Sequence, residues 1–245
     1  MAAILLHCPS LILLCVSCHH IRSHCTTLCL LSRSGRKPCQ PPHRILLVLK
    51  ALKEGHKMRQ LVAYVLGTES SGKTDLVRQL EYLSKGQLCS APTKCTPTMG
   101  QEVSTLAVVA SGGKRVTMEL RELGGSVINV WESFIASRKA KDTAVEKTTF
   151  FLLYVVDATA PHQLPLASSM FRYLTEGSGA VCADWRTLVV LQKCSSVNAM
   201  TKEEARDYFA DGERQNALCA VETDSWNGVG IGDVQQWLAD AAREP

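Results

Sequence analysis

The chain has 245 residues, of which 46% are hydrophobic and 20% charged, and its formal net charge is +4. This length allows one domain with an extension or two small domains, and it is long enough to bury a core. The composition is that of an ordinary globular protein and gives no reason to expect a nucleic-acid partner.

The charge is distributed unevenly along the chain. Residues 1–57 contain eight Lys or Arg and a single acid, Glu54, whereas the remainder has 19 basic and 22 acidic residues. Six of the seven His and six of the eleven Cys also precede Met58. We therefore expect a poorly structured, basic, Cys/His-rich extension over residues 1–57, which need not be part of the protein made in the cell, and a folded domain over residues 58–245.

The extension contains motifs with other interpretations. Residues 2–18 are apolar but lack the basic start of a signal peptide and are short for a membrane span, so membrane association stays open. The run Cys15-Val16-Ser17-Cys18-His19 has the spacing of covalent haem attachment, and the neighbouring His and Cys could bind zinc. The five later Cys lack paired spacing, which is typical of reduced thiols in a cytoplasmic protein.

From Gln60 on, short apolar runs alternate with helical stretches, the pattern of an α/β domain with a mostly parallel sheet. The later tryptophans are interpreted as core or interface aromatics: Trp185, Trp226 and Trp237. Residues 138–149 are charged and lack an apolar period, so we expect a surface loop there. The sequence predicts strands at 61–66, 103–110, 115–121, 150–156, 187–191 and 217–221, the second and third as a hairpin, and helices at 75–83, 163–174 and 232–242.

A phosphate-binding motif lies between the first predicted strand and the first predicted helix. The run Gly67-Thr68-Glu69-Ser70-Ser71-Gly72-Lys73-Thr74 matches G-x-x-x-x-G-K-[ST]. Its glycines let successive backbone N–H groups point at a phosphate, and the following helix presents its positive end. Lys73 is expected to reach the β and γ phosphates and the Thr74 hydroxyl to bind Mg²⁺. The chain is therefore predicted to bind a nucleotide with Mg²⁺.

Two later motifs favour a GTPase among the proteins that have this loop. Thr98, in Pro97-Thr98-Met99-Gly100, follows Thr74 by 24 residues, where a small GTPase has its first switch. The run Arg121-Glu122-Leu123-Gly124-Gly125 then follows a strand, where the second switch would put an acid near Mg²⁺ and a Gly amide near the γ-phosphate. The order and spacing of these motifs together indicate a small GTPase.

With these motifs, with Trp131 and with the strand end Tyr154-Val155-Val156-Asp157-Ala158, the sequence resembles the ADP-ribosylation factor family of small GTPases over about residues 60–238. The resemblance implies a P-loop small-GTPase fold, a six-stranded, mostly parallel sheet with helices on both faces. It implies a cytoplasmic switch that binds GTP or GDP with Mg²⁺. The expected partners are effector proteins that recognise the GTP-bound state, an exchange factor and an activating protein.

The resemblance also implies roles for single residues. Thr98 would bind Mg²⁺ and sense the γ-phosphate, Glu122 would hold a Mg²⁺-bound water, and the Gly125 amide would bond the γ-phosphate. Thr98, Gly125 and Ser126 form the expected catalytic set. Gln192, Lys193 and Ser195 would lie at the base, in addition to the P-loop at the phosphates.

Three departures from the family pattern change these expectations. Ser126 stands where the family usually has the Gln that orients the attacking water, so hydrolysis is expected to be slow. Gln192-Lys193-Cys194-Ser195 replaces Asn-Lys-x-Asp, so a hydroxyl stands where a carboxylate reads guanine, and Asp224-Ser225-Trp226 replaces a Ser-Ala-x loop. A non-hydrolysing interaction module therefore stays open, as does a P-loop ATPase or kinase with Asp157 as its metal-binding acid.

Overall fold

The computed structural model describes residues 60–87, 96–109, 113, 115–145, 147–210 and 217–243. These all belong to the second of two units into which the chain divides, Glu54–Pro245. The predicted extension over residues 1–57, with its haem-like and zinc-like motifs, lies outside the described residues, as do Cys89 and Cys95. Among the residues described, Cys182, Cys194 and Cys219 are free thiols. None of the helices described is long and apolar enough to cross a membrane.

Six strands form one sheet in the order β2-β3-β1-β4-β5-β6. β2 pairs antiparallel with β3, and the other neighbouring strands run parallel, so the predicted six-stranded, mostly parallel sheet and its hairpin are confirmed. The strands are β1 (Gln60–Leu66), β2 (Gln101–Val109), β3 (Arg115–Leu123), β4 (Thr148–Asp157), β5 (Arg186–Gln192) and β6 (Cys219–Glu222).

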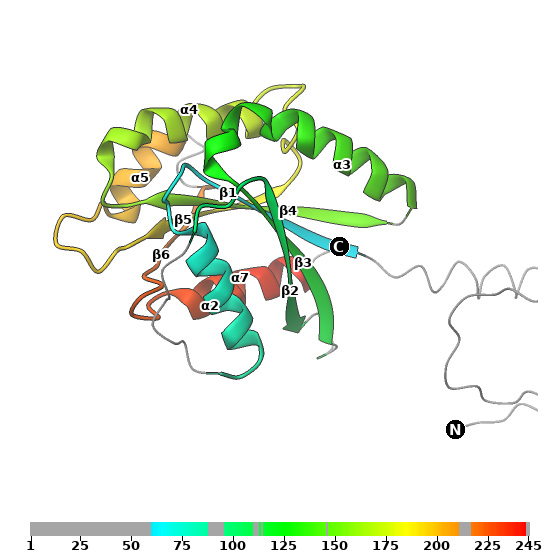
Figure 1. The fold of residues 1–245 in the computed structure, drawn as a ribbon, viewed down its shortest axis with the longest axis horizontal. Helices are drawn as coiled ribbons and strands as arrows, with labels where there is room; N and C mark the ends of the chain where they lie inside the picture. Colours follow the sequence, from blue (N-terminus) through cyan, green and yellow to red (C-terminus); the bar gives the residue numbers. More distant parts are fainter. Residues whose placement is uncertain are drawn as a thin grey trace, which may run out of the picture. The chain divides into compact units, whose positions relative to one another are not determined.

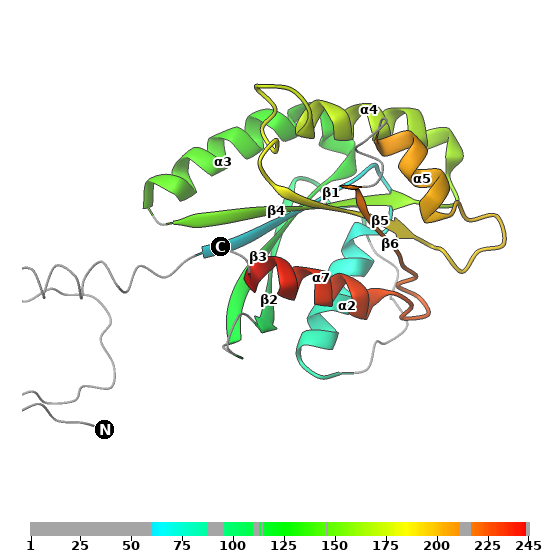
Figure 2. The ribbon, with the colours of Figure 1, turned by 180° about the vertical axis from the view of Figure 1, so that it is seen from behind.

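Helices cover both faces of the sheet, which is why the central strands β1 and β4 are apolar and buried over almost their whole length. Figure 1 shows α3, α4 and α5 on one face and α2 and α7 on the other, and Figure 2 shows the same layers from behind. The helices are α2 (Lys73–Ser84), α3 (Trp131–Val145), α4 (Leu164–Thr175), α5 (Lys202–Phe209) and α7 (Ile231–Arg243), with short 3₁₀ helices η2 (Gly125–Val130) and η3 (Pro161–Gln163).

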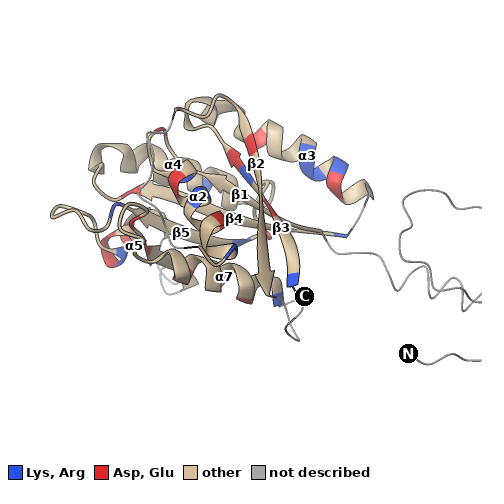
Figure 3. Ribbon diagram, turned by 60° about the horizontal axis from the view of Figure 1, so that its bottom comes forward, with Lys and Arg blue, Asp and Glu red and all other residues tan. Residues whose placement is uncertain are grey.

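The prediction of a surface loop over residues 138–149 is wrong, because residues 138–145 belong to α3 and residues 148 and 149 begin β4. The apolar contacts of α3 are concentrated at its beginning, where Trp131 and Ile135 are fully buried in the core. The rest of the helix is charged, and Figure 3 shows both acidic and basic residues along it. The charged stretch that begins at residue 138 is therefore the second half of a helix whose first half packs in the core.

The charged half of α3 is held by polar contacts to distant parts of the chain. Asp142 pairs with the buried Arg121 of β3. Lys139 donates a hydrogen bond of 3.2 Å to the Val181 carbonyl, and its ammonium lies 5.7 Å from the centre of the Trp185 ring. Trp185 is itself 8% exposed and belongs to the core, as expected. These contacts stabilise a helix that local periodicity did not reveal.

Helix α5 was also not predicted, although its start has a readable signal. The Thr201 hydroxyl accepts a hydrogen bond from the Glu204 backbone N–H, and the Glu204 carboxylate accepts one from the Thr201 backbone N–H, which together form a capping box. Ala205 and Phe209 then bury one face of the helix in the core. The spacing Thr-x-x-Glu marks this helix start in the sequence.

Candidate nucleotide-binding site

The P-loop joins β1 to α2 at the carboxyl edge of the parallel strands, where ligands of α/β sheets bind. Gly67, Ser70 and Gly72 have positive φ angles of 154°, 61° and 89°, which turn the chain sharply around the loop. A Cβ atom at Gly67 would lie 2.1 Å from the Val155 carbonyl oxygen, so the loop lies directly against β4. The predicted strand, loop and helix thus occur in the order that the motif requires.

Lys73 lies buried inside this loop. Its ammonium donates to the carbonyl oxygens of Gly67 (2.9 Å) and Thr68 (2.8 Å) and lies 3.4 Å from the Ser71 hydroxyl. Burial lowers the pKa of Lys73 to about 8, although the charges of two carboxylates act in the opposite direction. Because these hydrogen-bond partners are neutral, the ammonium charge can be used for an anion, as a phosphate site requires.

Three oxygen-bearing side chains meet beside Lys73. The Thr74 hydroxyl of α2 donates to the Glu122 carboxylate of β3 (2.6 Å), and the Thr98 hydroxyl donates to the same oxygen (3.2 Å). The two hydroxyl oxygens are 3.4 Å apart. Burial raises the pKa of Glu122, while the hydrogen bond from Thr74 and the charge of Lys73 oppose that shift. The three residues predicted to bind Mg²⁺ are therefore neighbours in space.

The chemistry of this group fits Mg²⁺. The ion prefers oxygen ligands, usually keeps several water molecules and needs only one or two carboxylates in a nucleotide site. Thr74 and Thr98 offer hydroxyl oxygens, and Glu122 offers one buried carboxylate that can act directly or through water. No group of three His, Cys, Asp or Glu in the described ranges could hold a metal ion in another way.

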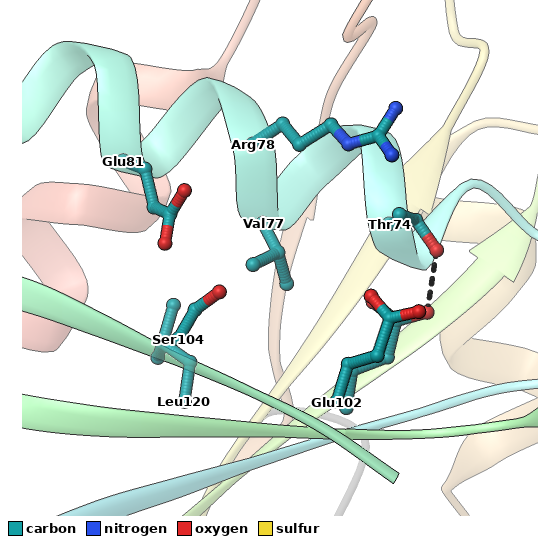
Figure 4. Close-up of a pocket in the computed structure, with 8 residues that line it drawn as sticks. Thr74, Val77, Arg78, Glu81, Glu102, Ser104 and Leu120 are labelled. Atoms are coloured by element: carbon teal, nitrogen blue, oxygen red, sulfur yellow. Dashed lines mark hydrogen bonds between the residues drawn. The ribbon is translucent and has the colours of Figure 1, made fainter. Parts of the chain in front are cut away.

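A second carboxylate lies close to this group. Glu102 of β2 is directly opposite Glu122 in the antiparallel register, and its charge adds to the upward pKa shift of Glu122. Figure 4 shows Glu102 lining a small pocket of about 120 Å³ between α2 and the β2–β3 hairpin, with the hydrogen bond of Thr74 at its edge. Glu102 was not predicted as a site residue, because its position opposite Glu122 follows only from the strand register.

Gly125 lies against the P-loop on the other side of the cleft. A Cβ atom there would be 2.3 Å from the Glu69 nitrogen and 2.5 Å from the Thr68 carbonyl carbon, so only glycine fits. Ser126 follows and is exposed.

The cleft has a volume of about 340 Å³ and is lined by residues 69–75, Thr96, Pro97, Thr98, Glu122, Gly125, Ser126, Lys193 and Trp226. It brings the P-loop together with most of the predicted site residues.

Gln192 and Lys193 come from the end of β5. Gln192 is 1% exposed, and its amide donates to the Ser225 hydroxyl (2.8 Å) and accepts from the Ser225 backbone N–H (3.3 Å). It therefore lies behind the cleft and connects two loops. Lys193, which lines the cleft, has a positive φ of 67° and donates to the Ser70 carbonyl (3.2 Å).

Asp157 ends β4 on the far side of the P-loop from the three oxygen ligands. Its carboxylate pairs with Lys193 and accepts from the backbone N–H and hydroxyl of Thr159, at 2.8 and 2.6 Å. Although burial acts against it, these bonds lower the pKa of Asp157. The acid bonded to Thr74 is instead Glu122. This arrangement favours the GTPase interpretation over an ATPase or kinase that uses Asp157 to bind the metal.

The loop after β6 borders the base end of the cleft. Asp224 and Val229 exchange two backbone hydrogen bonds of 2.9 and 3.0 Å, which close a tight loop between them. Trp226 at its tip is 62% exposed and lines the cleft. Of the two expected roles, core or interface aromatic, the first is thus wrong for this residue, and the second stays a prediction. The buried Asp224 carboxylate accepts from the backbone N–H of Trp226 (2.9 Å) and from the side-chain amide of Asn227 (2.7 Å). Ser195 is exposed and is not among the residues that line the cleft.

Comparisons with known proteins agree with this architecture. A family model described as the ADP-ribosylation factor family matches residues 45–242. No curated protein matches the chain. The solved structure of the Arl6 BBS3 small GTPase from Trypanosoma brucei with bound nucleotide analogue GppNp is similar, with a TM-score of 0.54 and 18% sequence identity. The match covers 76% of this chain and 98% of that one, and it confirms the predicted small-GTPase fold.

Proposed function

Because the chain belongs to the ADP-ribosylation factor family, we propose that it is a switch that binds GTP or GDP together with Mg²⁺. The observation that supports this proposal most directly is the meeting of Thr74, Thr98 and Glu122 beside Lys73. Thr98 comes from the segment before β2, so a ligand that draws its hydroxyl toward the metal would rearrange that segment. A switch of this kind responds to the γ-phosphate.

Each site residue has a place in this proposal. The backbone amides of residues 67–74 and the Lys73 ammonium would hold the phosphates, with the Gly125 amide at the γ-phosphate. Thr74 and Thr98 would bind Mg²⁺, and Glu122 would hold one of its waters. Mg²⁺ when bound neutralises phosphate charge. Lys193 and Ser195 would contact the base, while Gln192 positions the loops behind it.

Slow intrinsic hydrolysis is part of the proposal, because the short side chain of Ser126 is poorly suited to orient a water molecule. The same residue favours a second candidate, a non-hydrolysing module that binds nucleotide and recognises protein partners. The run Arg121-Glu122, in place of the usual Trp-Asp, supports a resemblance to the atypical member ADP-ribosylation factor-like protein 16. Effectors that recognise the GTP-bound state, an exchange factor and an activating protein are the proposed partners.

Binding of a fluorescent GTP analogue to the purified chain tests nucleotide binding. Lys73→Ala should abolish Mg²⁺-dependent binding, because backbone amides alone cannot offset the phosphate charge. Lys85→Ala removes an exposed ammonium at the other end of α2 and should bind like the wild type. Mass analysis of the nucleotide retained after gentle purification identifies the base. If a folded Lys73→Ala variant bound the GTP analogue with unchanged affinity, the proposal would be wrong.

A further inference from the structure

The two glycines that follow β3 leave the orientation of one peptide unit open. Glycine has no Cβ and adopts positive and negative φ angles about equally readily. The peptide between Gly124 and Gly125 could therefore face the cleft with its N–H or, after a flip, with its carbonyl oxygen. Only the first orientation offers a donor to a phosphate. The proposed contact of the Gly125 amide with the γ-phosphate thus depends on what selects that orientation.

Two contacts fix the place of Gly124 itself. Its backbone N–H donates to the Gly100 carbonyl (2.8 Å). A Cβ atom on Gly124 would lie 2.2 Å from the Thr98 carbonyl oxygen, so the segment before β2 packs directly against this residue. These contacts hold the N–H and the Cα atom of Gly124, but they do not decide which way the following peptide turns.

The indole of Trp131 holds that peptide. Its Nε1–H donates to the Gly124 carbonyl (3.0 Å), and the side chain is fully buried in the core. The Val127 backbone N–H reaches the same carbonyl at 3.4 Å, in a turn that is not helical at Val127, so the indole is the closer donor. A flipped peptide would leave the buried indole N–H without this acceptor, which is costly.

The position of the carbonyl determines that of the amide. In a planar trans peptide the C=O and N–H bonds point in opposite directions, and the Gly124 carbonyl and the Gly125 N–H belong to the same peptide. Because the carbonyl is bonded to a core side chain, the N–H points away from the core. Gly125 lines the cleft and lies against Glu69 of the P-loop, which is the side where a γ-phosphate would bind.

We propose that Trp131 is the positioning residue for the Gly125 amide and gives the site its preference for a nucleoside triphosphate over a diphosphate. This inference rests on the proposed nucleotide site. An amide that donates to an anion also makes its own carbonyl a stronger acceptor. A γ-phosphate on the Gly125 amide should therefore strengthen the bond from Trp131, which is the first residue of α3.

The first test removes the indole N–H. Trp131→Phe keeps an aromatic ring but no donor, so the ratio of affinities for the GTP analogue GppNp and for GDP should fall about tenfold, mostly through GppNp. Competition against one fluorescent GDP analogue at fixed Mg²⁺ measures both affinities. Trp185→Phe makes the same change at another buried tryptophan of this core, at the amino end of β5 and so at the opposite edge of the sheet from the P-loop, and should keep the ratio.

A ratio measured within one variant does not depend on the fraction of protein that is folded. A merely structural role for Trp131 would weaken both nucleotides equally, so an unchanged ratio in Trp131→Phe would overturn the inference. If that variant does not fold, Trp131→3-benzothienylalanine replaces the indole N–H by sulfur while keeping the shape of the side chain, and the same ratio decides.

The second test observes the bond in the wild-type chain. The proton resonance of the Trp131 indole N–H, assigned by its loss in the variant, should move to higher frequency when GppNp replaces GDP, whereas that of Trp185 should stay in place. Equal Trp131 resonances in the two complexes would contradict the inference. If the wild-type chain binds no nucleotide at all, the proposed function fails and the inference with it, whereas binding without these differences rejects the inference alone.

Discussion

At the residue scale, the hydroxyl of Ser126 extends only one carbon from the backbone, beside a glycine that is fixed against the P-loop. A Gln in that place has one more methylene group, followed by an amide that can both donate to and accept from a water molecule. This difference in reach is the reason why we propose that hydrolysis is slow. Nucleotide binding depends on the P-loop and not on residue 126, so a change at Ser126 should affect hydrolysis without affecting binding.

We predict that the wild-type chain hydrolyses GTP in a single turnover no faster than about 10⁻⁴ s⁻¹, the intrinsic scale of unassisted small GTPases. Ser126→Gln should raise that rate at least tenfold by orienting the water. Asn129→Gln introduces the same side chain at a neighbouring exposed position and should have no effect. A wild-type rate on the order of 1 s⁻¹ would show that another residue positions the water.

Trp226 offers an exposed aromatic face beside Lys193 in the cleft. Stacking of a base on an aromatic ring contributes about 1–3 kcal/mol and does not depend on the identity of the base. We predict that Trp226→Ala weakens GTP and ATP equally, by about tenfold, and that Trp226→Phe keeps most of the affinity. Calorimetric titration measures both, with Tyr208→Ala as an exposed aromatic control on α5. Full affinity in Trp226→Ala would exclude contact with the base.

At the element scale, the structure depends on contacts that a local pattern reports only in part. The strands and the helices α2, α4 and α7 were predicted because their apolar periods match the faces they bury. Helix α3 was missed because its charged half is stabilised by Arg121 of β3 and by Trp185, which immediately precedes β5. The same holds for the site. The P-loop, Thr98 and Glu122 could be predicted from the spacing of the motifs. The hydrogen bond between Thr68 and Gln163 could not, because the two residues are 95 positions apart in the sequence.

The ion pair of α3 with β3 can be tested by its effect on stability. The Arg121 guanidinium bonds Asp142, Glu119 and the Tyr64 hydroxyl, and although burial acts against it, these partners raise its pKa. Asp142→Ala leaves a buried cation with one carboxylate fewer, so we predict a loss of about 2–3 kcal/mol in the free energy of unfolding.

Urea denaturation without nucleotide measures the loss. The control is Asp240→Ala, which removes a pair with Arg243 whose two side chains are 42% and 48% exposed, and it should cost less than about 1 kcal/mol. Equal losses in the two variants would mean that the α3 contact contributes no more than a surface pair.

At the scale of the whole molecule, the sheet order places β1 between β3 and β4, so that the P-loop lies at the centre of the carboxyl edge. The strand ends that carry Glu122, Asp157 and Lys193 then surround it. Thr98 precedes β2, the strand at the edge of the sheet, and contacts α2 and β3 through Thr74 and Glu122. An ion bound by these groups would connect the β2–β3 hairpin to α2, the helix that follows the P-loop.

A ligand that binds only the folded state adds RT ln(1 + [L]/Kd) to stability, about 2.7 kcal/mol when its concentration is a hundred times Kd. We therefore predict that GTP raises the unfolding temperature of the wild-type chain and that Mg²⁺ enlarges this shift. Glu122→Gln keeps an oxygen that accepts from Thr74 and Thr98 but removes the charge, so the Mg²⁺-dependent part should fall by more than half. Thermal unfolding with GTP, with and without EDTA, separates the two parts. Glu81→Gln, on α2 at the far side of the small pocket of Figure 4, should keep the full shift, and an equal Mg²⁺ response in both variants would remove Glu122 from the metal site.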